Sequence, residues 1–277
     1  MKNLKMFCIS IEPNHLNFIK KLEYLPVGLG DKDFSKDWYK DTSGNNISKK
    51  NKNYGEYTYH YWIWKNYMEK LGDEWIGFCQ YRKFWNLEKY NKNELNIKNL
   101  NNYVLKEIPI KFNEYEVILG EPIFVNEFKA AKFIKKGLKI ITKNPLLILN
   151  KNKRNINFHF DLMHGENNLN KAIDLLDDEN KEDFRNFVNT EISFNPHNMF
   201  ICKSKEKLKK YYEDLFPWLE KCEQLFGFNS LKGYGQIRIY GFLAERFMSY
   251  WFKKNTNHTT IPILFYDIRE DLNQSPS

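Results

Sequence analysis

The sequence predicts an α/β protein with a mostly parallel sheet flanked by helices. Short apolar runs typical of buried strands alternate along the chain with longer segments in which apolar residues recur at helical spacing. This alternation favours parallel pairing, because parallel strands are usually joined through a helix. The length of 277 residues suits one large domain or two small ones, and we expect a single domain over 1–277 with a helical C-terminal part.

Apolar runs bounded by turn formers or charged residues predict the strands. They lie at 4–11, 74–80, 115–119, 198–201 and 261–266. Residues 25–34 and 41–53 are rich in turn formers and predict loops.

A helix is predicted over 54–71, where aromatic and aliphatic residues recur every three to four positions before Gly72 stops the pattern. Further helices are predicted at 127–143, 166–189, 205–226 and 236–253. The segment 127–143 combines one apolar stripe with many lysines, so it should be a basic amphipathic helix.

The net charge is +8 and the pI about 9.0, which favours anionic partners such as nucleotides, nucleic acid or an acidic membrane surface. Lysine and asparagine are spread over the whole chain, which indicates a general compositional habit rather than one patch. Cys8, Cys79, Cys202 and Cys222 lie in or beside apolar runs and predict buried, reduced thiols. We expect neither a signal peptide nor a transmembrane segment, and therefore a cytoplasmic protein.

The predicted strand 74–80 ends at Gln80 and is followed by Tyr81, Arg82 and Lys83. Ligands of open α/β sheets bind beyond the carboxyl ends of the strands, and two adjacent cations there could hold a diphosphate. The alternative is a strand that simply runs into solvent with charged residues.

Glu56 stands three residues after Asn53, which is close to a capping box, so its role could be structural or functional. Lys65 and Asn66, further along the same helix, could face a ligand. Lys65 could equally be an ordinary surface lysine.

Two later segments carry groups capable of proton transfer. On the predicted helix 236–253, Glu245 could act as a general base, or Arg246 and Arg238 could hold it for stability. Asp161 and His164, three residues apart, could share a proton, or form a turn with a helix-start contact. The motifs of zinc proteases, P-loop enzymes, serine hydrolases and dinucleotide-binding folds do not occur in the sequence.

Taken together, these blocks resemble the bacterial family known as domain of unknown function 4422, described as capsular or exopolysaccharide glycosyltransferases. The resemblance covers roughly 5–253, and its most specific blocks are Tyr61-Trp62-Ile63-Trp64-Lys65-Asn66 and Gln80-Tyr81-Arg82-Lys83. Other matching positions are Pro26-Val27-Gly28, Asp41-Thr42-Ser43-Gly44, Asn46-Ile47-Ser48, Asn51, Asn53-Tyr54, Glu56, Thr58, Val117-Ile118-Leu119, His164, Asn198-Met199-Phe200-Ile201 and Gly241-Phe242-Leu243-Ala244-Glu245-Arg246.

The resemblance implies a GT-A-like fold and transfer of a sugar from a nucleotide-sugar, most simply a UDP-sugar, to a surface polysaccharide or lipid-linked oligosaccharide. It implies a donor half over 1–125 and an acceptor half over 126–277. The donor would contact Glu56, Lys65, Asn66, Gln80, Tyr81, Arg82, Lys83 and Arg246. Glu245 would be the base of an inverting reaction, with His164 or Asp161 behind it, whereas a retaining reaction would need no base there.

Two departures from the family pattern bear on the chemistry. The family's His before Tyr-Arg is Gln80 here, and its second Arg is Lys83, so this position suits donor recognition rather than proton transfer. GT-A enzymes usually hold a divalent metal with Asp-x-Asp after a strand. Here Asp31-Lys32-Asp33 lies in a predicted loop, so we expect Arg82 and Lys83 to offset the phosphate charge and expect no metal ligands.

The basic helix 127–143 could lie peripherally on an anionic membrane surface, near a lipid-linked acceptor, or pack on the core with a solvated face. No nucleic-acid-binding module is evident, so nucleic acid is not an expected partner. The rival functions are transfer of a non-sugar group from a nucleotide carrier, and non-catalytic binding of a nucleotide or nucleic acid.

Overall fold

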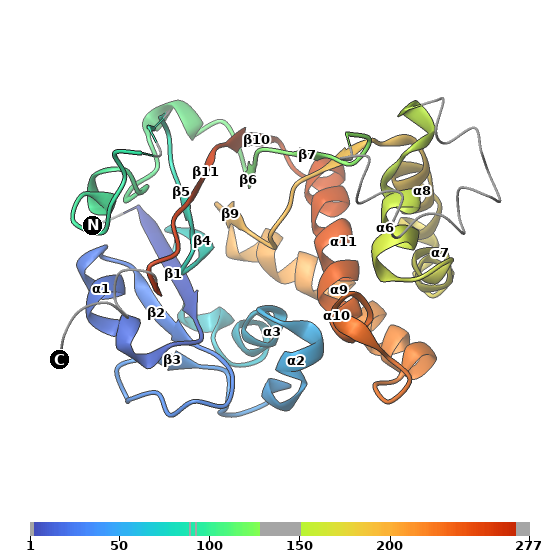
Figure 1. Cartoon of the computed structure of the whole chain (residues 1–277), viewed down its shortest axis with the longest axis horizontal. Coiled ribbons are helices and arrows are strands. Elements are labelled where there is room, and N and C mark those ends of the chain that lie inside the picture. The colour runs from blue at the N-terminus through green and yellow to red at the C-terminus, as the bar shows by residue number, and fades with distance from the viewer. Residues whose placement is uncertain (1–2, 89, 92, 128–150, 270–277) are drawn as a thin grey trace. The chain divides into compact units, whose positions relative to one another are not determined.

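The computed structural model describes residues 3–88, 90–91, 93–127 and 151–269, which are coloured in Figure 1. By their contacts these residues form two compact units. Unit 1 contains those within 1–121, 199–212 and 255–277, and unit 2 contains those within 122–198 and 213–254. The expected assignment of donor and acceptor halves stays a prediction.

Within the described residues, unit 1 is built on a sheet of nine strands. They are β1 (Leu4–Ser10), β2 (Leu25–Gly28), β3 (Tyr39–Lys40), β4 (Trp75–Gln80), β5 (Lys83–Trp85), β6 (Val117–Gly120), β9 (Phe200–Cys202), β10 (His258–Ile261) and β11 (Ile263–Phe265). The order is β10-β6-β9-β4-β1-β2-β3, with β5 and β11 paired beside β4. Along this path only β9 is antiparallel to its neighbours, which confirms the predicted mostly parallel sheet.

The register brings three strand ends to one edge of this sheet. Ser10 at the end of β1 lies opposite Gly28 at the end of β2, and Ile9 lies opposite Gln80 at the end of β4. We call this the carboxyl edge, where ligands of α/β sheets bind.

Aromatic rings fill the space between the sheet and helix α3 (Tyr57–Asn66). Phe78 of β4 stacks on Phe7 of β1 and lies 4.2 Å, ring to ring, from His60 of α3. Burial lowers the pKa of His60 to about 3, so this histidine is a neutral core residue whose Nδ1 lies 2.7 Å from the Tyr212 hydroxyl. The other short helices of unit 1 are α1 (Leu16–Lys21), α2 (Asn51–Tyr54), η1 (Pro13–His15), η2 (Ser48–Lys50), η3 (Met68–Lys70), η4 (Leu100–Asn102) and η5 (Ile110–Phe112).

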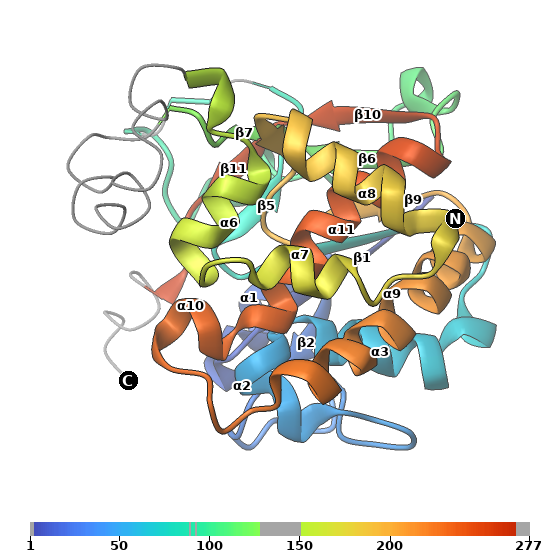
Figure 2. The same cartoon turned by 90° about the vertical axis from the view of Figure 1, so that its right-hand side faces the viewer.

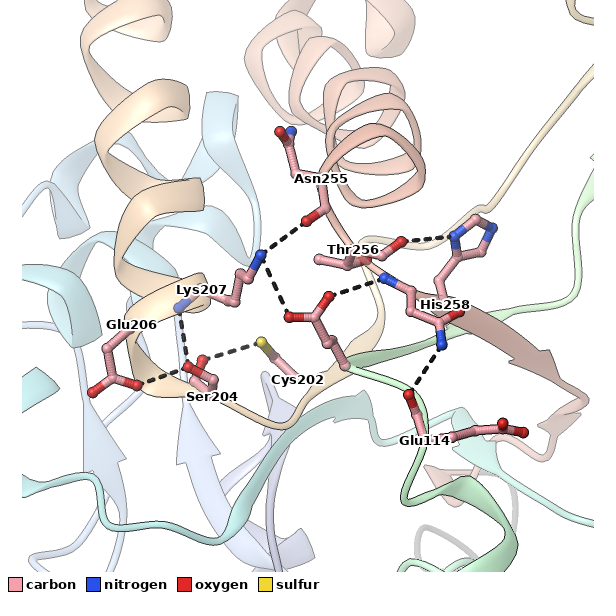
Figure 3. Close-up of polar contacts among 10 residues, drawn as sticks. Glu114, Cys202, Ser204, Glu206, Lys207, Asn255, Thr256 and His258 are labelled. Carbon is pink, nitrogen blue, oxygen red and sulfur yellow. Dashed lines mark hydrogen bonds and ion pairs between the residues drawn. The ribbon is translucent and has the colours of Figure 1, made fainter.

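A polar cluster ties together the segments that enter β6 and β10 (Figure 3). Glu116 accepts a hydrogen bond from the Asn257 backbone N–H at 3.0 Å and pairs with Lys207 at 3.4 Å. Lys207 also donates to the Asn255 carbonyl at 3.0 Å, and Asn257 donates to the Glu114 carbonyl at 3.0 Å. These bonds fix the start of β10 beside β6, at the opposite edge from Gln80.

Unit 2 is mainly helical, and Figure 2 looks onto three of its helices, α6, α7 and α8. Its elements are β7 (Ile123–Phe124), η6 (Lys151–Lys153), α6 (Ile156–His164), α7 (Asn168–Ile173), α8 (Asp178–Thr190), β8 (Ser193–Phe194), the later part of α9 (Lys205–Phe226), α10 (Gly233–Ile237) and α11 (Ile239–Asn255). Twelve residues of α11 are buried. Phe184, Trp218 and Phe247 join α8, α9 and α11 with ring centroids 5.1–5.9 Å apart.

Several element predictions are confirmed. The strands predicted at 4–11, 74–80, 115–119 and 198–201 correspond to β1, β4, β6 and β9, and the helix predicted at 205–226 is α9. The helix predicted at 54–71 is shorter, because α3 begins at Tyr57 and ends at Asn66.

Other predictions need correction. Residues 25–28 are strand β2 rather than loop, because their backbone completes the parallel ladder with β1. The helix predicted at 166–189 is two helices, since the Asp177 side chain accepts the Asn180 N–H and starts α8 anew. Residues 51–54 form α2 within a predicted loop, and the strand predicted at 261–266 is the pair β10 and β11. The basic helix expected at 127–143 lies outside the described residues, apart from Glu127.

No helix among the described residues has the length and apolar character needed to cross a membrane.

Candidate functional site

At the carboxyl edge of unit 1, three of the candidate donor-binding side chains form a chain of contacts. Gln80 donates from Nε2 to Glu56 Oε1 at 3.3 Å, and Lys83 donates from Nζ to Gln80 Oε1 at 3.3 Å. The capping-box interpretation of Glu56 is wrong, because α3 begins at Tyr57 and makes Glu56 the N-cap residue. Its carboxylate instead reaches the end of β4.

Tyr81 and Arg82 follow β4 and continue this edge. The Tyr81 ring is buried beside the imidazole of His15, with ring centroids 5.3 Å apart, and the Arg269 guanidinium lies 5.1 Å from the centre of the Tyr81 ring. Burial lowers the pKa of His15 to about 4, so His15 is neutral, and its Nδ1 lies 2.7 Å from the Ser10 hydroxyl at the end of β1. Arg82 is exposed, so it is placed to meet an anion from solvent.

Among the contacts described for Lys65 and Asn66, none is to Glu56, Gln80 or Lys83. The Lys65 ammonium lies 3.3 Å from the centre of the Trp64 ring, a cation–π contact at the surface. Asn66 accepts the Asn45 N–H at 3.0 Å and donates to the Asn45 carbonyl at 2.7 Å. Asn66 therefore holds the preceding loop, and a donor contact for either residue stays a prediction.

A cavity of about 650 Å³ lies within unit 2 and gathers the other candidates. It is lined by Ile123, His159, Asp161, Leu162, Met163, His164, Gly165, Phe194, Pro196, His197, Lys232, Gly233, Tyr234, Gly235, Gln236, Phe242, Glu245 and Arg246. The structure thus brings Asp161 and His164 of α6 together with the Glu245–Arg246 pair of α11, which lies far away in the chain. The volume suits a small organic molecule or a sugar.

Asp161 and His164 lie in α6 and do not form a turn, but the predicted helix-start contact is present, because Asp161 bonds to Asn167, the N-cap residue of α7. One of the Asp161 carboxylate oxygens accepts the backbone N–H of Asn167 at 2.9 Å. Burial nevertheless raises the pKa of Asp161 to about 6, because desolvation outweighs that hydrogen bond. A carboxylate with this pKa is suited to accept a proton near neutral pH.

His164 stands at the end of α6, one helical turn from Asp161. Its Nδ1 lies 3.0 Å from the Gly235 carbonyl oxygen, which can only accept, so the proton sits on Nδ1. The ring stacks on Phe242 at 4.0 Å between centroids. Gly235 is required for this contact, because a Cβ there would overlap the carbonyl oxygen of Met163.

The buried Arg246 forms an ion pair with the partly buried Glu245 at the cavity wall. Burial lowers the pKa of Arg246, and the Glu245 carboxylate opposes that effect. The guanidinium also donates to His159 Nδ1 at 3.2 Å and lies 4.1 Å from the Phe194 ring centre. Burial, aided by the Arg246 charge, lowers the pKa of His159 to about 3, so His159 is neutral with its proton on Nε2.

Glu245 also shapes the backbone beside the cavity. Its Oε1 accepts the His197 N–H at 2.6 Å. His197 and Asn198 have φ of 76° and 54°, a left-handed conformation that costs energy in residues with a Cβ. The Glu245 carboxylate therefore stabilises both the strained loop at His197 and the charge of Arg246, and so it has a structural role beside the cavity.

Sequence reasoning missed His159, His197, Tyr234 and Gly235. A signal for two of them was present: Tyr234 stands between two glycines, a pattern that often marks a special backbone conformation. The described residues contain no group of three or more His, Cys, Asp or Glu arranged to hold a metal ion. The expectation that no metal is held by the protein stays a prediction.

The chain resembles known proteins both in sequence family and in fold. Residues 10–256 match the protein family described as Domain of unknown function (DUF4422). Among solved structures, the apo form of the bifunctional glycosyltransferase WbbM is similar, with a TM-score of 0.66 at 20% sequence identity. The match covers 95% of this chain and 45% of WbbM, so the chain spans less than half of that protein. It establishes a shared GT-A-like fold. No curated protein matches the sequence.

Proposed function

Because the chain belongs to the family Domain of unknown function (DUF4422) and has the fold of a glycosyltransferase, we propose that it transfers a sugar from a nucleotide-sugar to a surface polysaccharide or its lipid-linked precursor. The observation that carries this proposal is the cavity of unit 2. It combines an ionisable carboxylate of raised pKa, Asp161, with His164 and the paired Glu245 and Arg246.

In this proposal Asp161 is the general base. It would accept the proton of the acceptor hydroxyl as that oxygen attacks the anomeric carbon of the donor sugar. Glu245 is less suited to this role, because its two oxygens already accept the His197 N–H and the Arg246 guanidinium. His164 would hold the acceptor, since its tautomer is set by Gly235.

The donor is proposed to bind at the carboxyl edge of unit 1, with a UDP-sugar as the first candidate. Arg82 and Lys83 supply positive charge there, and Glu56 and Gln80 supply hydrogen-bonding groups. The cations would stabilise the nucleoside diphosphate as it leaves, without a protein-bound metal. A peripheral contact of 127–143 with an anionic membrane stays part of the proposal, to be tested with anionic liposomes at low salt.

A thermal-shift screen against UDP-, GDP-, CDP-, CMP- and dTDP-sugars, each with manganese or with chelator, tests this proposal. A ligand at a hundredfold excess over its Kd stabilises the folded state by about 2.7 kcal/mol. We expect a rise in Tm with one nucleotide class that persists with chelator. Arg82→Ala should weaken that binding roughly tenfold or more, because a charged hydrogen bond contributes about 1.5–3 kcal/mol.

Lys111→Ala is the matched control, because Lys111 is an exposed cation that precedes the amino end of β6. It should leave nucleotide binding unchanged. A strict requirement for manganese would refute the cationic clamp. Absence of any nucleotide shift, with folded protein, would favour a non-catalytic scaffold, and steep salt-dependent binding to random DNA or RNA would favour a nucleic-acid-binding protein.

A further inference from the structure

Tyr234 is the most exposed aromatic side chain at the cavity of unit 2. It lines the cavity and leaves 67% of its surface accessible, although unit 2 buries most of its other rings. An aromatic ring that lines a cavity and stays exposed offers apolar surface to a ligand, and such surfaces mark binding sites. Ile123, 41% exposed, lines the same cavity.

The ring is held rather than free to swing. Its edge lies against Phe242, with centroids 5.9 Å apart, and the Arg238 guanidinium lies 5.7 Å from its centre. The following residue, Gly235, packs so closely on α6 that no Cβ fits, and the preceding Gly233 has a φ of 69°. Two glycines therefore set the backbone that presents Tyr234, which lowers the entropy lost when a ligand stacks on it.

The remainder of the cavity offers a different kind of surface. Asp161 carries a carboxylate oxygen toward which a hydroxyl can donate, and the neighbouring Gln236 carries an amide. The two carboxylates of the lining, Asp161 and Glu245, are balanced by two cations, Lys232 and Arg246, so the cavity has no excess of positive charge for a phosphate. A neutral sugar fits these conditions, because its ring has an apolar C–H face and a rim of hydroxyls.

We propose that Tyr234 is the platform on which the acceptor sugar stacks, with one sugar hydroxyl directed to Asp161. This inference rests on the proposed function, because it assigns the cavity to the acceptor. It makes Tyr234 a residue that determines acceptor binding and not donor binding.

The test uses the full chain and a panel of methyl hexopyranosides, with saturation-transfer NMR to detect contact and titration to measure Kd. We expect saturation of the C–H protons on one face of at least one sugar. Tyr234→Phe should keep this binding, because the ring remains, and Tyr234→Ala should weaken it about tenfold or more. Phe124→Ala is the matched control, since Phe124 is 55% exposed in β7 but does not line the cavity.

Equal binding by Tyr234→Ala and the unaltered protein would overturn the inference, as would the absence of binding to every sugar of the panel. The nucleotide thermal shift separates this failure from that of the proposed function. If nucleotides bind and Tyr234→Ala leaves sugar binding unchanged, only the inference fails. If sugars bind through Tyr234 and no nucleotide binds, the transferase proposal fails and the sugar site stands. Melting curves of each variant establish that it is folded.

Discussion

The carboxylate of Asp161 shows how its surroundings prepare one residue for chemistry. Burial raises its pKa to about 6, while the Asn167 N–H pulls the pKa in the opposite direction. The nearby Glu166 contributes a smaller upward shift through its negative charge. Desolvation therefore decides the value, and it leaves a base that is ionised at neutral pH yet able to take up a proton.

Asp161→Asn should lower kcat by roughly 10²–10⁴-fold, which is the usual contribution of a general base. In the unaltered enzyme the rate should rise with pH through about 6, as Asp161 loses its proton, and this dependence should vanish in Asp161→Asn. The measurement is nucleotide release against pH at saturating donor.

Glu166→Gln is the matched control, because it removes a neighbouring charge from a residue that does not line the cavity. It should move the pH midpoint slightly downward and keep most of the rate. An unchanged kcat in Asp161→Asn would move the role of base to another residue.

The folded pKa of Asp161 lies above its unfolded value, so the folded state binds more protons between about pH 4 and 6. Its contribution to stability is present below pH 4 and is lost as the pH rises through 6. Asp161→Asn should accordingly melt at a higher temperature than the unaltered protein at pH 7. The ionised carboxylate that would serve activity at pH 7 therefore lowers the stability of the folded state.

Among the elements, helix α9 was predicted correctly although it contains a proline in its interior. It runs from Lys205 to Phe226 and contains Pro217, which lacks the N–H that would bond to the Glu213 carbonyl. Pro217 is exposed, whereas its neighbours Phe216 and Trp218 are buried. The buried aromatic residues therefore keep the helix continuous despite the proline.

Pro217→Ala should restore the missing hydrogen bond and raise the free energy of unfolding by about 1–3 kcal/mol. Urea unfolding at pH 7 measures this. Glu220→Ala, at another exposed position of α9, should change stability by less than about 0.5 kcal/mol. A lower stability in Pro217→Ala would contradict this expectation and mean that the proline stabilises the folded state.

At the scale of the whole molecule, three of the described histidines are held in the neutral form because desolvation lowers their pKa. Burial lowers the pKa of His15 to about 4 and those of His60 and His159 to about 3. His15 and His60 belong to unit 1, and His159 belongs to unit 2. Each has a folded pKa below its unfolded value near 6.5, so the unfolded chain takes up protons first as the pH falls.

Stability should therefore fall below pH 6.5, by about 1.4 kcal/mol per pH unit for each histidine near pH 5. If the units unfold separately, the loss in unit 1 should be about twice that in unit 2. Urea titrations at pH 7, 6 and 5 test this. His60→Gln should reduce the slope of unit 1, and an unchanged slope would mean that His60 is already charged in the folded state.

The sequence predicted the elements that local contacts determine better than those that depend on contacts between distant segments. Strands β1, β4 and β6 and helix α9 follow from local periodicity, because a buried face imposes its period on the residues that form it. Strand β2 was missed because its Pro and Gly are turn formers, and only pairing with β1 makes the segment a strand. Likewise, the single helix expected at 166–189 is two helices, because Asp177 caps the start of α8. The charged helical pattern runs through this position without a visible break.

By itself the sequence determined the fold class, the family and the residue types available for chemistry, because these are written in local pattern and in the specific Tyr-Trp-Ile-Trp-Lys-Asn and Gln-Tyr-Arg-Lys blocks. Only the tertiary structure decided that Asp161, His164 and Glu245 share a cavity and that Asn66 holds a loop instead. The physical reason is that burial, which sets pKa values and ion pairs, arises from contacts between distant segments, such as Gly235 against α6, that no local pattern encodes.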